Sequence, residues 1–297
     1  MEVLKRYSLI ALLGAACLFS SCEEEFEVKV EDTSPKIFLQ GMVSPFLNSP
    51  VYAYKAVPVG VVRSDAQDFT VRDLSLKING TEVGIVEEEG GKGWRSELDY
   101  NEGDELEFTI STRETGEATA VTTIPRMLGF SADSTLVEGN VIYTIRFDET
   151  LDEDSKFAVA VILADDEYLR VSSLPLSKHG EDETLLGALS PDFRLVSLPF
   201  GFDCKAFDGA LFNGNELGKE KTLSLSVPYY EPDDPSQKLK LLVYTLSEEL
   251  YGYLNAEYNK NNNVLSMLGL APSNFAYSNV DGGYGVLGGY SLRIWTK

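Results

Sequence analysis

Residues 74–86 read LSLKINGTEVGIV, and this stretch decides the fold class. Apolar and polar residues alternate from Leu74 to Ile78 and alternate again over residues 81–86. An alternation of period two places the apolar side chains on one face of a β-strand. The Asn-Gly pair between the two runs suits a type I′ turn, in which both central residues adopt positive φ. The stretch therefore predicts a β-hairpin with its turn at Asn79-Gly80.

Further strand candidates lie on both sides of this hairpin. They cover residues 36–41, 51–59, 105–111 and 118–124. Short strands that recur at this spacing, with turn residues between them and no long helical pattern, are typical of a β-sandwich. We predict an immunoglobulin-like β-sandwich over residues 35–125, which ends at Pro125-Arg126.

The second half of the chain continues the series of strands. The candidates there cover residues 141–147, 156–163, 193–198, 222–227 and 238–246. We predict a second β-rich domain over residues 126–297. The expected fold class is therefore all-β with one C-terminal helix, arranged as two β-sandwich domains.

The one helix is expected over about residues 247–260. Ser247 is placed to cap its first turn, and two acidic residues follow where the helix dipole favours negative charge. Leu250, Leu254 and Tyr258 recur at helical spacing and lie on one face. We expect this face to pack on a sheet.

A glycine-rich segment follows at residues 277–291. It lacks the Gly-Lys-Ser/Thr sequence of a phosphate-binding loop. Its glycines are expected to allow tight turns, bulges and close backbone approach before a last strand at 291–295.

The N-terminus has the pattern of an export signal over residues 1–21. Lys5 and Arg6 give a basic start, and the apolar run from Ser8 to Phe19 is too short to span a bilayer. Ser20-Ser21-Cys22 resembles a bacterial lipobox, in which the cysteine is acylated and becomes the first residue of the mature protein. The alternative is an ordinary signal peptide that happens to contain a cysteine.

An acidic run follows the cysteine directly. Glu23, Glu24 and Glu25 resemble the signal that exports lipoproteins of Bacteroidetes to the outer face of the outer membrane. The alternative is a solvated linker, and both interpretations are compatible. Residues 22–34 are expected to form a flexible acidic tether between the lipid and the folded part.

Composition excludes several function classes. The formal net charge is −22, so a nucleic acid would be repelled, and the same charge disfavours lying flat on an anionic membrane. After removal of the signal and acylation of Cys22, Cys204 is the one remaining thiol and His179 the one histidine. These two residues do not suffice for a Cys/His zinc site, and no nucleophile elbow accompanies His179. We expect no metal and no cofactor, and we interpret the acidic segment 148–154 as a solvated turn rather than a calcium loop.

Two C-terminal motifs carry a resemblance to a known family. The helix contains Tyr251, Tyr253 and Leu254, and the later segment contains Asn279, Gly282, Gly283, Gly285 and Gly288. Together they resemble the signature of the domain of unknown function 4249 family, whose members are outer-membrane lipoproteins of Bacteroidetes. Thr123-Ile124-Pro125 and Phe207-Asp208-Gly209 resemble the family as well. The resemblance implies no catalytic residues, and we interpret the motif residues as structural.

The resemblance also implies a place near TonB-dependent transporters, beside which such lipoproteins are often encoded. The leading hypothesis is a non-enzymatic, surface-exposed lipoprotein that assists nutrient binding or import, with a glycan or a peptide as candidate ligand. If the ligand is a glycan, Trp94 is the candidate stacking residue, although it can equally be a buried anchor. An envelope hydrolase with paired carboxylates and an adhesive or structural lipoprotein are the alternatives.

Overall fold

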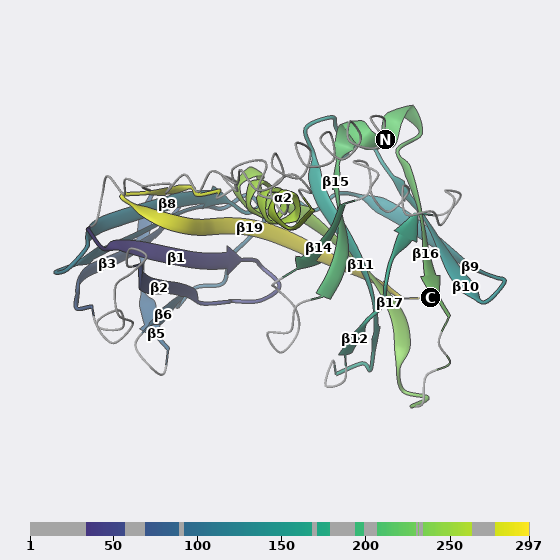
Figure 1. Ribbon diagram of the computed structural model, residues 1–297, viewed down its shortest axis with the longest axis horizontal. Coiled ribbons are helices and arrows are strands. Elements are labelled where there is room, and N and C mark those ends of the chain that lie inside the picture. Colours follow the sequence, from purple (N-terminus) through teal and green to yellow (C-terminus); the bar gives the residue numbers. More distant parts are fainter. Residues whose placement is uncertain are drawn as a thin grey trace, which may run out of the picture. The chain divides into compact units, whose positions relative to one another are not determined.

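One long β-sheet runs through both halves of the chain (Figure 1). The computed structural model describes residues 34–56, 69–88, 92–167, 171–178, 194–198, 207–229, 231, 234–262 and 277–296. In order across the sheet, the strands are β14 (Arg194–Leu198), β15 (Phe207–Asn213), β11 (Lys156–Ala164), β17 (Lys238–Leu246), β19 (Gly283–Thr296), β1 (Lys36–Val43), β2 (Val51–Ala56), β6 (Gly93–Ser96) and β5 (Ile85–Glu87), and β12 (Val171–Ser173) pairs beside β11. Cys22, Glu23, Glu24, Glu25, His179 and Cys204 lie outside the described residues.

The strand β19 joins the two halves of this sheet. Its first part, from Gly283 to Gly289, pairs in parallel with β1. Its second part, from Tyr290 to Thr296, pairs in antiparallel fashion with β17. The strand β19 therefore lies between β1 of the first half and β17 of the second half.

Two smaller sheets complete the fold. One consists of β18 (Val280–Asp281), β8 (Gly116–Thr123), β7 (Glu105–Thr112), β3 (Val71–Ile78) and β4 (Thr81–Val83). The other consists of β13 (Ser177–Lys178), β16 (Thr222–Pro228), β10 (Asn140–Phe147) and β9 (Phe130–Val137). Within the described ranges, the helices are the 3-10 helix η3 (Gly214–Glu220) and the α-helix α2 (Glu248–Asn262). No helix in the described ranges is long and apolar enough to cross a membrane.

The alternation of residues along β19 shows how these layers pack. Leu287 belongs to the core beneath the five-stranded sheet, and Trp295 packs on the core beneath the four-stranded sheet. Val286 and Tyr290, at even positions, belong to the core that α2 covers. Because successive side chains of a strand point to opposite faces, the two small sheets cover one face of the long sheet and α2 packs on the other.

The hairpin at 74–86 has the predicted turn. Asn79 and Gly80 have φ values of 51° and 76°, as a type I′ turn requires. The predicted second strand is divided, however. It pairs with β3 only from Thr81 to Val83, and from Ile85 it pairs with β6 in the long sheet. The predicted hairpin therefore contributes strands to both the five-stranded sheet and the long sheet.

The prediction of an all-β fold with one C-terminal helix is confirmed. Ser34–Lys297 form one compact unit, and the long sheet crosses the predicted boundary at Pro125. The core of the first half also includes Val280 and Leu287 from the C-terminal end. The ranges 35–125 and 126–297 as separate domains, and the immunoglobulin-like character of the first, stay predictions.

The glycine-rich segment is a correction to the sequence analysis. The last strand begins at Gly283, not at Ser291, so most of this segment is strand rather than turn. Close backbone approach, which was expected here, is confirmed at Gly285, where φ is +113° and a Cβ atom would lie 1.8 Å from the carbonyl oxygen of Leu39. The absence of side chains thus permits β19 to lie against its neighbours.

We predict that Gly285→Ala lowers the free energy of unfolding by about 3 kcal/mol or more, because it combines a left-handed φ with a backbone clash. Urea unfolding of the purified protein measures this. Gly139→Ala is the matched control, since Gly139 also has positive φ (+81°) but no atom within 4 Å of an added Cβ. The control should lose only about 1 kcal/mol. Equal losses in the two variants would contradict the role of close packing.

Candidate functional site

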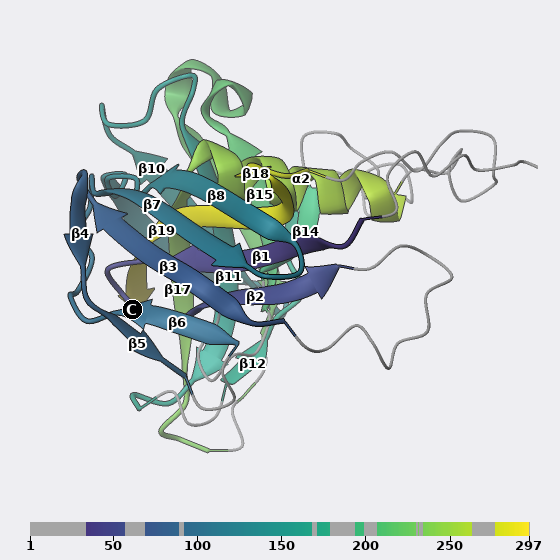
Figure 2. The same cartoon turned by 90° about the vertical axis from the view of Figure 1, so that its left-hand side faces the viewer.

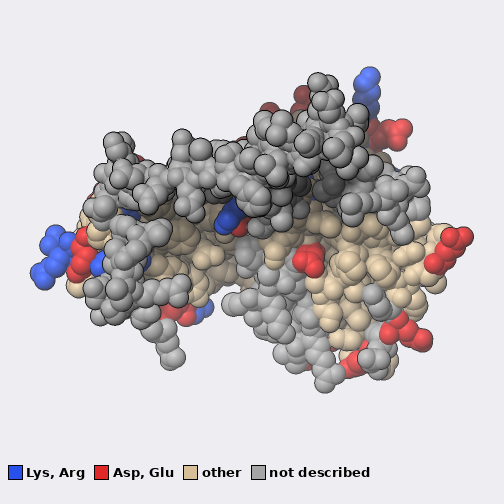
Figure 3. Space-filling view, viewed as in Figure 1, with Lys and Arg blue, Asp and Glu red and all other residues tan. Residues whose placement is uncertain are grey.

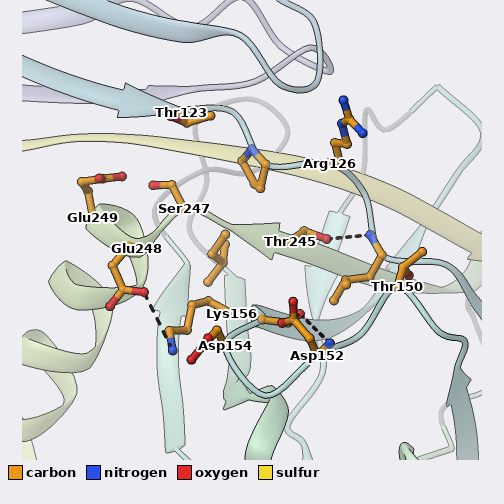
Figure 4. A pocket seen from close by; sticks show the side chains of 14 residues that line it. Thr123, Arg126, Thr150, Asp152, Asp154, Lys156, Thr245, Ser247, Glu248 and Glu249 are labelled. Carbon is orange, nitrogen blue, oxygen red and sulfur yellow. Dashed lines mark hydrogen bonds and ion pairs between the residues drawn. The ribbon is translucent and has the colours of Figure 1, made fainter.

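A pocket of about 430 Å³ lies where three segments of the chain meet (Figure 4). Its walls come from three segments: residues 123–128 at the end of β8 and after it, residues 150–156 at the β10–β11 turn and the first residue of β11, and residues 245–249 from the end of β17 to the start of α2. Pro125, Leu128 and Leu246 supply apolar surface, and the other lining residues are polar or charged.

The charged groups of the pocket are mostly acidic. Asp152, Asp154, Glu248 and Glu249 line it together with the cations Arg126 and Lys156. The pocket therefore has a negative formal charge and suits a polar ligand, or a segment of a partner, that carries basic groups. Acidic side chains elsewhere in the described part spread over the surface without forming one cluster on the face shown in Figure 3.

The turn between β10 and β11 is held by its own side chains. Asp148 accepts hydrogen bonds from the hydroxyl and the backbone N–H of Thr150, at 2.6 and 2.8 Å. The Ser155 hydroxyl donates to Asp152 at 2.6 Å. These hydrogen bonds lower the pKa of Asp148 and of Asp152, so both remain ionised near neutral pH. Asp152 is therefore suited to fixing the turn and to attracting cations, not to donating a proton.

Lys156 connects this turn to α2. Its ammonium lies 3.8 Å from a carboxylate oxygen of Glu248 and 5.2 Å from the centre of the Tyr251 ring. The guanidinium of Arg194 lies 5.5 Å from the centre of the same ring and pairs with Glu216 at 2.5 Å. Burial raises the pKa of Tyr251, so its hydroxyl stays protonated. The family residue Tyr251 thus has two cations near its ring, and one of them, Lys156, lines the pocket.

Ser247 lines the pocket and links three elements. Its hydroxyl oxygen accepts the backbone N–H of Leu250 at 3.2 Å, which is the predicted cap of α2. The same oxygen accepts the N–H of Gly289 in β19 at 3.1 Å and the hydroxyl of Thr122 in β8 at 3.2 Å. Thr122 also donates to Glu249 at 2.9 Å. Because Ser247 is buried, these contacts fix the junction of β8, β19 and α2.

The other family motif residues serve the fold around this junction. Leu254 is buried against the long sheet, and Tyr253 packs beside it half-buried. The amide of Asn279 donates to the carbonyl oxygens of Leu287 and Val121 at 2.8 and 3.0 Å, and it accepts the N–H of Leu287 at 3.0 Å. Asn279 therefore ties the segment before β18 to β19 and β8.

Three more motif glycines lie in close contact with backbone or helix. A Cβ on Gly282 would lie 2.2 Å from the carbonyl oxygen of Glu117, and one on Gly283 would lie 2.6 Å from that of Ile37. A Cβ on Gly288 would lie 2.6 Å from the Cβ of Leu250 in α2. These glycines of the motif thus permit β19 to pack closely between the five-stranded sheet and α2.

Trp94 does not fit the hypothesis of a sugar-stacking residue. It lies in β6, is 4% exposed and belongs to the core of the first half. Its ring centre lies 6.5 Å from that of Phe108. The cause is register, since Trp94 pairs with the buried Val51 and so points to the core face of the sheet. The alternative of a buried anchor describes it.

Sequence reasoning did not find the pocket. It identified the acidic turn and the first turn of α2 separately, as a solvated turn and as a dipole-matched helix start. The spacing along the chain does not show that residues 123–128 line the same pocket as these two segments. That contact depends on how β8 of the five-stranded sheet lies relative to β11 and β17 of the long sheet.

We predict that Ser247→Ala lowers the free energy of unfolding by about 2 kcal/mol, because the helix loses its cap and buried donors lose their acceptor. Chemical denaturation of the variant measures this loss. Ser131→Ala in β9 is the control, since Ser131 is exposed and should change stability by less than about 0.5 kcal/mol. A Ser247→Ala variant as stable as the control would show that the junction does not depend on this hydroxyl.

We predict that Trp94→Ala lowers the free energy of unfolding by about 3–5 kcal/mol, because it leaves a cavity in the core. Trp94→Phe should lose much less, since it keeps an aromatic ring in place. Thermal unfolding of both variants tests this. An alanine variant that keeps full stability but loses affinity for a glycan would restore the ligand hypothesis.

Comparisons with known proteins give little likeness in structure. One solved structure, titled "Complete structure of manganese lipoxygenase of Gaeumannomyces graminis and partial structure of zonadhesin of Komagataella pastoris", is 12% identical, with 72% of this chain and 76% of that chain covered and a TM-score of 0.21. The collagen-binding domain of the Erysipelothrix rhusiopathiae surface protein RspB is 8% identical, with 88% and 96% covered and a TM-score of 0.22. Scores this low support no inference about fold or function. No curated protein matches the chain.

The family comparison is decisive for classification. A model described as "Domain of unknown function (DUF4249)" matches residues 23–293, which is nearly the whole chain. The match includes the helix and the glycine-rich strand that carry the resemblance noted in the sequence. The chain therefore belongs to the DUF4249 family.

Proposed function

We propose that this protein is a lipid-anchored, non-enzymatic accessory protein of the bacterial outer membrane. It faces the cell exterior and assists the binding or import of a nutrient together with a TonB-dependent transporter. A glycan or a peptide is the candidate cargo. The acyl chains on Cys22 are its membrane anchor.

The observation that carries this proposal is the position of Cys22. Ser20-Ser21-Cys22 resembles a lipobox and follows a basic and apolar stretch. The DUF4249 match begins at residue 23, directly after this cysteine, and leaves the export signal outside. This agrees with a mature protein that starts at Cys22. Three acyl chains would hold it permanently, because one chain alone binds a membrane only marginally.

The acidic run and the pocket support the exposed location and the binding role. Glu23, Glu24 and Glu25 resemble the signal for export to the outer face. The pocket beside Lys156 and Glu248 has a volume within the range of small-molecule sites. Its mixed charges would recognise a polar cargo, or a basic segment of the transporter, by complementary electrostatics.

The test is co-purification from native membranes. The protein is tagged at its C-terminus, extracted with mild detergent and analysed by mass spectrometry of both the anchor and the companions. We predict triacylation at Cys22 and recovery of a TonB-dependent transporter in similar amount.

Cys22→Ala is the matched variant. It should lose acylation and should leave the outer-membrane fraction, since no other anchor is proposed. Recovery of the lipidated protein with no transporter would contradict the accessory role and favour an adhesive or hydrolytic lipoprotein. An unmodified Cys22 would contradict the anchor itself.

A further inference from the structure

Three tyrosines lie exposed together on the long sheet. Tyr52 and Tyr54 of β2 are 37% and 41% exposed, and Tyr284 of β19 is 48% exposed. The rings of Tyr52 and Tyr54 are nearly parallel, with an interplanar angle of 16° and centres 6.3 Å apart. Single exposed aromatic residues are ordinary, but a group of them on neighbouring strands marks an interaction surface.

Strand register places these rings on one face. Phe38 of β1 is paired with Tyr54 on one side and with Tyr284 on the other. Tyr54, Phe38 and Tyr284 therefore form a row across the sheet. Tyr52 is two positions from Tyr54 and shares its face. The ammonium of Lys36, also on this face, lies 5.3 Å from the Tyr284 ring centre. We name Lys36, Phe38, Tyr52, Tyr54 and Tyr284 the tyrosine face.

The tyrosine face differs in charge from the chain as a whole. The chain has a formal net charge of −22, whereas the five residues of this face include one cation, Lys36, and no carboxylate. Glu88, which lies beside Tyr52 at Gly93, is paired with Arg95. An anionic membrane repels a strongly acidic protein. That repulsion is weakest where the surface residues themselves carry no negative charge.

The tyrosine face also lies where the chain from Cys22 enters the sheet. Lys36 is the first residue of β1 and is paired with Ala56, the last residue of β2. Figure 2 shows the start of β1 on the same side as the end of β2. Thirteen residues separate Cys22 from Lys36. A chain of that length spans at most about 50 Å when fully extended. If Cys22 is acylated as proposed, the start of β1 therefore lies within about 50 Å of the bilayer.

We propose that the tyrosine face rests on the phospholipid headgroup layer of the membrane that holds the acyl chains of Cys22. This inference rests on the proposed function, because it requires the lipid anchor. Tyrosine suits the location, since its ring is apolar and its hydroxyl stays hydrated, and tyrosines are enriched at membrane interfaces. Lys36 adds an attraction to anionic headgroups. The contact gives the anchored protein one preferred orientation.

A glycan or a protein partner would also use exposed aromatic rings. The position of the face favours the membrane over both. It borders the entry of the tether, so the anchor alone brings it to the lipid at a high effective concentration. No further molecule is needed to explain an exposed aromatic patch at that place.

The experiment uses the lipidated full chain in vesicles of phosphatidylethanolamine and phosphatidylglycerol that contain phospholipids brominated near the headgroup. Tyr54→Trp and Tyr284→Trp each place a fluorescent probe on the tyrosine face. Val121→Trp is the matched control, because Val121 lies in β8 on the small sheet of the same half and is 44% exposed. The unsubstituted protein gives the background from Trp94 and Trp295.

We expect brominated lipid to quench the added fluorescence of Tyr54→Trp and Tyr284→Trp and to leave that of Val121→Trp unchanged. Equal quenching in the three variants would overturn the proposal, because the domain would then have no preferred face. Absence of quenching in all three would overturn it as well. Quenching of the two probes by added soluble glycan, with no response to brominated lipid, would replace the membrane with a sugar ligand.

Flotation of the same vesicles separates the two proposals. A chain that floats with the vesicles but shows no quenching keeps the anchor and loses the tyrosine face. A chain that does not float, and whose Cys22 is unmodified by mass spectrometry, loses the proposed function and the membrane contact together.

Discussion

The change of partner along β19 holds the described structure together. Gly283–Gly289 pair in parallel with β1, and Tyr290–Thr296 pair in antiparallel fashion with β17. Without this strand, the sheet of the first half and the sheet of the second half would share no hydrogen bonds in the ten-strand order. The strand β1 thus depends on residues at the far end of the chain. Contacts of such long sequence separation stabilise the fold only after both halves have formed.

The glycines of β19 make this arrangement sterically possible, and the pocket follows from it. These glycines pack closely against Leu39, Thr123 and Leu250. The five-stranded sheet, the long sheet and α2 therefore meet at one point. Ser247 and Thr122 then satisfy the N–H of Gly289 at that point. Ser247 takes part in this junction and also lines the pocket. The family motif and the pocket are therefore parts of one packing problem, although most motif residues do not line the pocket.

The local structure was predictable from the sequence, but the contacts between distant segments were not. Alternation and the Asn79-Gly80 turn identified the strands, and Ser247 identified the start of α2, because these signals are local. The last strand was predicted to begin too late, at Ser291 instead of Gly283, since glycines have low strand propensity and only tertiary contacts make residues 283–290 a strand. Trp94 was open to two interpretations because its face depends on pairing with Val51, which spacing alone does not reveal.

One strand shows why surface and core follow from context rather than from residue type. Tyr284 and Tyr290 lie on the same face of β19, six positions apart, yet Tyr290 is buried and Tyr284 is 48% exposed. The difference is α2, which packs on the part of the face that contains Tyr290 and leaves the part next to β1 and β2 uncovered. A face that serves as core at one end therefore continues as an aromatic surface at the other. That surface includes Lys36 at the start of β1 and, with it, forms the tyrosine face for which a membrane contact is proposed.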